Sequence, residues 1–238
     1  MVQNLHANES YVLYQCGTTA PVLAGYKAFA IPLQTLAVED TSVLGFLELL
    51  GLQLSVRYLQ PQYVTSACLL ALANSGEMQT LEASWGSNPT LRQTQLAAVG
   101  ALFTSAASST ANSIAISSTA DATPLTRAEW IKFVAVFFNQ EQAADALFAT
   151  ITRRYLCQRQ AAVAVTPQPV VAWTSYSWWA SPPQWVLARA SYKQTFVQDA
   201  GAQGVGNGTA DQLFNSAADL LAHLADADQA PTASYVRP

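Results

Sequence analysis

The sequence predicts an α/β fold with a mainly parallel sheet, and three observations lead to this prediction. Short apolar segments typical of strands alternate with helical segments of ordinary length through the first half of the chain, which is the pattern of an α/β layer. Hydrophobic residues make up 51% and charged residues 11% of the sequence, so a substantial core is expected. The length of 238 residues fits one large domain or two small lobes.

The first half of the chain carries these strands and helices in alternation. Strands are expected at residues 11–15, 27–33, 55–59, 101–105 and 114–117, where apolar and aromatic residues stand between turn-forming residues. Helices are expected at residues 40–50 and 90–98, with a third between them that runs through Ala73 and stops near Gly76. The first helix opens at Asp40, a capping residue type, and ends before Gly51, which suits the position after a helix.

The strongest helical pattern lies in the middle of the chain. Thr126 and Glu129 match the Thr-x-x-Glu capping box, and Asn139 can cap a second helix. We therefore expect a short helix over residues 126–138, followed by a longer one over residues 140–160. From periodicity alone, the alternative is an ordinary pair of core helices in an α/β domain.

The second half holds few expected strands. Residues 170–174 form one, and helices are expected at residues 192–200 and 210–225. A glycine-rich turn at residues 201–208 follows a helix rather than a strand, so it does not match a phosphate-binding loop. We expect this half to be an incomplete lobe.

Several classes of function are excluded by composition and motifs. A net charge of −4 with only 11 Lys and Arg argues against nucleic acid as a partner. His6 and His223 are the only histidines and lie near opposite ends of the sequence, which argues against a His-based metal site or a Ser-His-Asp triad. No catalytic residue, metal or cofactor is therefore expected. Residues 1–10 lack the pattern of a signal peptide.

Aromatic residues supply the best candidate for a binding site. Trp178, Trp179 and Trp185, together with Tyr176, crowd what we expect to be a connection between a strand and the next helix. Ligands of open α/β sheets bind at such connections, so these rings can form a flat wall for a large ligand. The alternative is a rigid, packed loop. A core position is an equal alternative for Trp85, at an earlier turn.

The order and spacing of these segments resemble the periplasmic-binding-protein family whose two α/β lobes are joined by one long helix. Cobalamin-binding and ferric-siderophore-binding proteins belong to it. Tyr63-Val64-Thr65-Ser66 falls where that family has a ligand-facing Tyr loop, and Trp85-Gly86-Ser87-Asn88 is similar to its Trp-x-Gly-x-Asn stretch. Residues 140–155 resemble its inter-lobe helix, and residues 170–176 resemble the first strand of its second lobe. The Ala- and Gln-rich composition is similar to that of algal cobalamin-acquisition relatives.

This resemblance implies two Rossmann-like lobes joined by one long helix. The N-terminal lobe would span residues 1–138, the inter-lobe helix residues 139–160, and a truncated C-terminal lobe residues 161–238. It implies a binding protein, not an enzyme, that holds a bulky metal-chelate ligand in a cleft between the lobes for uptake. A cobalamin-like corrinoid ranks first and a ferric siderophore second. The implied ligand-binding residues are Tyr63, Thr65, Trp85, Tyr176, Trp178, Trp179 and Trp185.

The resemblance also bears on partners and location. Bacterial members dock on a membrane permease through one Glu in each lobe, but the helix at residues 40–50 is out of register with that pattern and residues 189–194 contain no Glu. A membrane transporter is thus an expected partner without identified docking residues, and the chain is expected to be a monomer. Its location would be extracellular, periplasmic or cell-surface if a signal sequence precedes this chain.

Two rival functions remain open at the level of sequence. One is an α/β hydrolase or transferase that uses Ser66 or Thr65, which would need His6 or His223 to converge on it from the chain ends. The other is an interaction or structural module that keeps the fold without binding a ligand.

Overall fold

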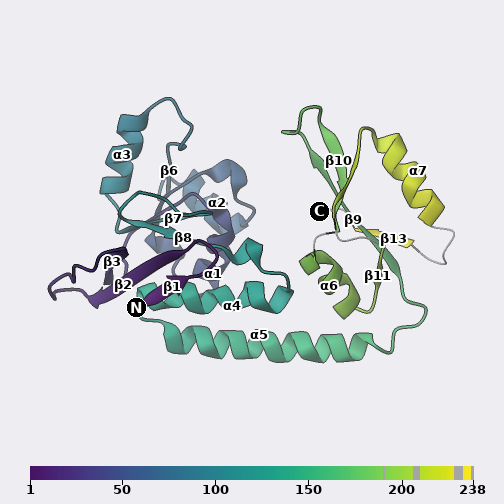
Figure 1. Cartoon of the computed structure of the whole chain (residues 1–238), viewed down its shortest axis with the longest axis horizontal. Helices are drawn as coiled ribbons and strands as arrows, with labels where there is room; N and C mark the ends of the chain where they lie inside the picture. The colour runs from purple at the N-terminus through teal and green to yellow at the C-terminus, as the bar shows by residue number, and fades with distance from the viewer. Residues whose placement is uncertain (190, 206–209, 228–232, 237–238) are drawn as a thin grey trace. The chain divides into compact units, whose positions relative to one another are not determined.

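The computed structural model describes residues 1–189, 191–205, 210–227 and 233–236, which fold into two compact units. Unit 1 consists of Met1–Ala120 and Glu129–Phe148, and unit 2 of Asp121–Ala128 and Ala149–Pro238. Figure 1 shows the course of the chain through both units. The expected boundaries at residues 138 and 160 stay a sequence-based prediction.

A five-stranded parallel sheet forms the centre of unit 1 (Figure 1). Its strands lie in the order β6-β5-β4-β7-β8, and every neighbouring pair is parallel. Numbered along the chain, this order is 3-2-1-4-5, which matches five of the six strands of the doubly wound nucleotide-binding fold, so the expected parallel α/β fold is confirmed. The strands are β4 (Leu36–Val38), β5 (Val56–Leu59), β6 (Gln79–Thr80), β7 (Ala101–Thr104) and β8 (Ser113–Ala115).

Some of the helices between these strands begin at capping side chains. The Asp40 carboxylate accepts a hydrogen bond from the Ser42 N–H at 2.8 Å, and the Ser66 hydroxyl accepts one from the Leu69 N–H at 3.3 Å. Gly51 has a φ of +71° at the end of the first helix, as expected from the sequence. The helices of this part are η1 (Thr41–Val43), α1 (Leu44–Leu49), η2 (Gln53–Ser55), η3 (Pro61–Tyr63), α2 (Ala67–Asn74), α3 (Pro89–Ala97) and η4 (Ser118–Ala120).

A small sheet precedes the parallel one and is fastened to it by a buried polar cluster. The small sheet contains β1 (Val2–Asn4), β2 (Glu9–Gln15) and β3 (Tyr26–Ile31). Within the cluster, the Lys27 ammonium pairs with Glu9 and donates to the Ser113 hydroxyl at 2.7 Å. The fully buried Tyr11 donates to Glu9, and its oxygen accepts from the Ala115 N–H at 2.9 Å. Because Ser113 and Ala115 belong to β8, the cluster joins the two sheets.

The same cluster shifts two pKa values. Burial alone would raise the pKa of the Glu9 carboxyl, but hydrogen bonds from Lys27 and Tyr11 hold that pKa below its ordinary value of 4.5. Burial, followed by the hydrogen bond to Glu9, raises the pKa of the Tyr11 hydroxyl. Glu9 is therefore ionised and Tyr11 protonated at neutral pH.

The central helices form as expected, but both predicted caps are wrong. The first helix is α4 (Pro124–Ala135), continued by η5 (Val136–Phe138), and the second is α5 (Glu141–Ala162). The Thr126 N–H donates to the Thr123 hydroxyl at 3.2 Å, so Thr123 rather than Thr126 occupies the capping position. Asn139 has a φ of 55° and ends η5 in the left-handed conformation, which Asn tolerates better than most residues.

Unit 2 contains more strands than the sequence predicted. Its sheet has the order β11-β9-β10-β12, and β13 also pairs with β9. β9 and β10 are antiparallel, as are β10 and β12. The predicted helix at residues 210–225 is wrong at its start, because residues there form β12. The elements are β9 (Val170–Ser177), β10 (Gln184–Leu187), α6 (Ser191–Asp199), β11 (Gln203–Gly204), β12 (Gln212–Phe214), α7 (Ala217–Ala227) and β13 (Ala233–Val236).

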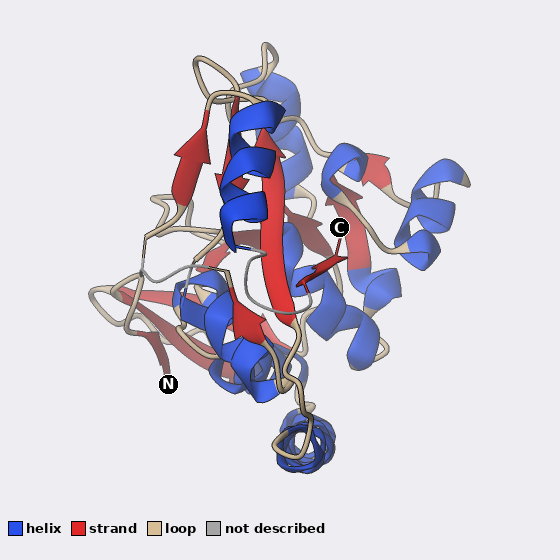
Figure 2. Ribbon diagram, turned by 90° about the vertical axis from the view of Figure 1, so that its right-hand side faces the viewer, coloured by secondary structure: helices blue, strands red, loops and turns tan. Residues whose placement is uncertain are grey.

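The core of unit 2 is small. Leu220 and Leu224 of α7 are buried together with Ala172 of β9, Leu187 of β10 and Phe214 of β12. Figure 2 shows the helices and strands of each unit in a second view. Of the expected glycine-rich turn, residues 206–208 lie outside the described residues.

Replacing Glu9 with Gln is expected to lower the free energy of unfolding by about 3 kcal/mol at pH 7, because Lys27 would lose its partner in a largely buried site. Because the folded-state pKa of Glu9 is depressed, its stabilising effect is present above pH 4.5 and is lost as pH falls through the folded-state pKa. Urea unfolding of both proteins at several pH values measures this difference. Glu77→Gln, at an exposed position, serves as control. Equal losses in both variants would contradict the role of the cluster.

Candidate functional site

Three of the predicted site residues follow strands of the parallel sheet in unit 1. Tyr63 and Thr65 come after β5, and Trp85 comes after β6. Because the carboxyl ends of parallel strands meet at one edge of a sheet, all three belong to the same edge, which is where open α/β sheets bind ligands. The Trp85 side chain is 70% exposed and that of Tyr63 50% exposed. Thr65 is exposed as well.

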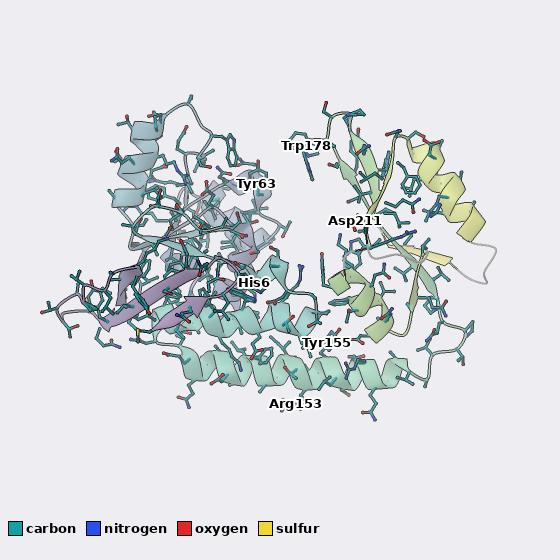
Figure 3. The ribbon with its side chains drawn as sticks, in the orientation of Figure 1. His6, Tyr63, Arg153, Tyr155, Trp178 and Asp211 are labelled. Carbon is teal, nitrogen blue, oxygen red and sulfur yellow. The ribbon has the colours of Figure 1, made fainter. Side chains whose placement is uncertain are left out.

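A short helical turn holds the loop that carries Tyr63 and Thr65. The Tyr63 N–H donates to the Gln60 carbonyl at 3.1 Å, and the Val64 N–H donates to the Pro61 carbonyl at 3.1 Å. Val64 is buried between its two exposed neighbours. The loop is thus anchored by Val64, which leaves Tyr63 and Thr65 available to solvent. Figure 3 labels Tyr63 on this loop.

Helix α3 fixes the loop that carries Trp85. The Arg92 guanidinium donates to the Glu82 carbonyl at 2.7 Å and pairs with the Glu39 carboxylate at 3.1 Å. The Gln95 amide accepts from the Glu82 N–H at 2.8 Å. Since Glu39 follows β4, Arg92 joins the loops after β4 and β6. Trp85 is therefore an exposed ring on a braced loop, and the core alternative for it is wrong.

The aromatic residues of unit 2 lie on a β-hairpin, which corrects the expected strand-to-helix connection. Trp178 and Trp179 fall in the turn between β9 and β10 and are 68% and 73% exposed. Their rings form an edge-to-face pair with centroids 5.7 Å apart. Figure 3 shows Trp178 at this turn. The packed-loop alternative is wrong for these two rings.

Tyr176 and Trp185 lie opposite each other on the two strands of this hairpin. They are directly paired in the ladder, with ring centroids 5.1 Å apart. Tyr176 is 48% exposed, while Trp185 is partly buried and packs against the core of unit 2. Trp185 therefore packs beside Tyr176 on the same face of the sheet and belongs to the strand rather than to the loop.

Three of the residues that a rival enzyme would use, Ser66, His6 and His223, make contacts within the fold. The Ser66 hydroxyl caps α2 and donates to the Glu48 carboxylate at 2.6 Å. The ring of His6 packs beside Trp130, and that of His223 beside Phe214, at centroid distances of 6.4 and 5.2 Å. Among the described residues no group of three or more His, Cys, Asp or Glu side chains is placed to hold a metal ion.

Sequence reasoning missed Arg92 and Glu39, which brace this edge. Arg92 is only one charged residue in a predicted helix, and Glu39 resembled an ordinary solvated residue at a helix start. The pairing joins residues 53 positions apart, and no local pattern signals such a contact.

Comparison with known proteins identifies the fold. No family model matches the sequence, and no curated protein sequence shows a significant match. Solved structures do match. A periplasmic binding protein from Veillonella parvula has a TM-score of 0.57 and 15% identity, over 86% of this chain and 73% of that one. The fold is that of the periplasmic binding proteins.

Two further structures with this fold have known ligands. The siderophore-binding protein BauB, bound to acinetobactin and ferric iron, matches with a TM-score of 0.55 and 14% identity over 81% of this chain and 68% of its own. The vitamin B12-binding protein BtuF of Vibrio cholerae matches with a TM-score of 0.54 and 8% identity over 81% of this chain and 74% of its own. The predicted family fold is therefore confirmed. None of the helices in the described segments has the length and apolar character needed to cross a bilayer.

The exposure of the three site tryptophans can be tested directly. Replacing Trp85, Trp178 and Trp179 together with Phe is expected to remove most of the tryptophan fluorescence that acrylamide quenches easily, because these rings are the most exposed. The remaining Trp130, Trp173 and Trp185 should be quenched less steeply. Stern–Volmer plots of both proteins measure this, and identical slopes would contradict the described exposures.

Proposed function

We propose that this chain is a non-catalytic solute-binding protein that holds a bulky metal-chelate ligand for uptake. A cobalamin-like corrinoid is the first choice and a ferric siderophore the second. The observation that carries this proposal is that Trp85, Trp178 and Trp179 are each at least two-thirds exposed. Trp85 lies at the edge where open α/β sheets bind ligands, and Trp178 and Trp179 lie in the turn of a hairpin. We assign ligand contact to Tyr63, Thr65, Trp85, Tyr176, Trp178 and Trp179, and a positioning role to Trp185.

The energetics of aromatic rings favour a large apolar ligand. A Trp or Tyr side chain that becomes covered removes roughly 150–250 Å² from water, and each square ångström is worth about 25 cal/mol. Monomeric proteins seldom expose several large rings without a partner for them. A flat macrocycle or a chelate with apolar faces would cover such rings.

The charged side chains near the proposed contacts favour one of the two ligands over the other. The carboxyl edge of unit 1 carries Glu39 and Asp40, and its Arg92 is already paired with Glu39. In unit 2, the Lys193 ammonium lies 5.5 Å from the centroid of the Trp173 ring. An anionic siderophore would be bound more strongly by unpaired cations. This supports the uncharged amide-bearing corrinoid over an anionic chelate.

The comparison proteins support the same class of ligand. BauB is described as siderophore-binding and BtuF as vitamin B12-binding. A structure from Saccharomonospora viridis, with a TM-score of 0.56 and 14% identity, is described as part of an ABC-type Fe³⁺-hydroxamate transport system. We include in the proposal a membrane transporter as partner and a location outside the cytoplasm. The expected cleft between lobes stays a prediction.

Equilibrium dialysis with cyanocobalamin and with a ferric hydroxamate tests the proposal. The wild-type protein is expected to bind cyanocobalamin, and Trp178→Ala is expected to weaken binding about tenfold or more, because the variant loses a central apolar contact. Trp85→Ala should weaken binding as well, by the same reasoning.

Leu54→Ala is the matched control, since Leu54 is 72% exposed and lies outside the proposed site. It should bind as the wild-type protein does. A folded wild-type protein that binds neither ligand would overturn the proposal, and would favour the interaction-module alternative.

A further inference from the structure

A hollow lies within unit 2, and none of the residues that line it is among those assigned above. The C-terminal half of α5 and one face of α6 enclose a groove of about 400 Å³ that is lined by Ile151, Tyr155 and Phe196, among others. A neighbouring cavity of about 230 Å³ lies between α6 and β9 and is lined by Trp173 and Phe196. Volumes of roughly 300–1,000 Å³ are typical of small-molecule sites.

The two hollows meet at the exposed face of α6. Phe196 and Ala200 line both of them. Phe196 is 47% exposed and Trp173 36% exposed, so neither ring is fully covered. A ligand that lay along α6 would cover Phe196 and continue towards Trp173. The shape and lining of the hollow thus fit an elongated apolar chain.

The charges at the groove favour an anionic head group. Asp199 is already satisfied, because it accepts from the Tyr155 hydroxyl at 2.8 Å and lies 3.8 Å from the Arg159 guanidinium. Burial, followed by this hydrogen bond, raises the pKa of Tyr155 to about 12, so Tyr155 remains a donor. Arg154 also lines the groove, is exposed, and makes no ion pair or hydrogen bond with any residue in the described ranges. One positive charge is left uncompensated.

We propose that this groove binds an anionic amphiphile, namely a long-chain carboxylate whose tail covers Phe196 and whose head group pairs with Arg154. An Arg guanidinium binds a carboxylate through two parallel hydrogen bonds, which gives the head group a fixed position. The apolar lining holds the tail through buried area. The site shares no residue with the proposed chelate site, so either can exist without the other.

Helix α5 supplies a matched control beside Arg154. Figure 3 shows Tyr155 on the side of α5 that faces α6 and Arg153 on the opposite side of the helix. Arg153 is exposed and does not line the groove. Arg153 and Arg154 therefore carry the same charge at adjacent positions, but only one of them can reach a ligand in the groove.

Isothermal titration with dodecanoate, below its micelle concentration, tests the site. The wild-type protein is expected to bind dodecanoate, and Arg154→Gln to weaken binding about tenfold, which corresponds to about 1.4 kcal/mol. Arg153→Gln should bind as the wild-type protein does, and Arg154→Lys should recover part of the loss. Dodecanol, which lacks the charge, should bind equally to the wild-type protein and to Arg154→Gln.

A second variant tests the position of the tail. Phe196→Ser should weaken the binding of both dodecanoate and dodecanol, and circular dichroism confirms that the variant is folded. The proposal is overturned if the wild-type protein does not bind dodecanoate, or if Arg153→Gln and Arg154→Gln weaken binding equally. Binding that Phe196→Ser leaves unchanged would also overturn it.

Discussion

The three residues of β4 are the constraint on which the rest of unit 1 depends. Leu36, Ala37 and Val38 are fully buried and pair with β5 on one side and β7 on the other. Leu36 and Val38 belong to one hydrophobic cluster and Ala37 to another, so both faces of the strand are covered. A parallel strand covered on both faces requires helical crossovers, and these crossovers bring the loops after every strand to one edge.

The proposed ligand contacts follow from this arrangement in unit 1 and from a different one in unit 2. In unit 1 the loops at the carboxyl edge are braced by Arg92 and by Val64, which leaves Trp85 and Tyr63 exposed. In unit 2 the exposed rings sit on an antiparallel hairpin that packs on a small core. In both units, buried groups hold the backbone in place and leave the aromatic rings exposed to solvent. Such an arrangement suits a pre-organised binding surface.

Local signals predicted much of the fold, and long-range pairing explains the rest. Asp40 and Gly51 mark the two ends of a helix because capping depends only on nearby atoms. By contrast, β4 is too short to show a period, and β9 continues through Ser175 and Ser177 because its partner β10 supplies the pairing. Thr123 and Thr126 both suit a cap, so the sequence does not distinguish them. The resemblance of whole segments to the family predicted the fold. The hairpin that carries Trp178 was not predicted and is seen only in the structure.

Hydrogen–deuterium exchange with and without cyanocobalamin is the most direct test of the proposed ligand contacts. Slower exchange is expected in three segments: residues 60–66 and 82–88 of unit 1, and residues 176–184 of unit 2. Backbone exchange in the small sheet of residues 2–31 should not change. Measurable binding that leaves exchange in these segments unchanged, or slows it only in other segments, would contradict the proposed contacts.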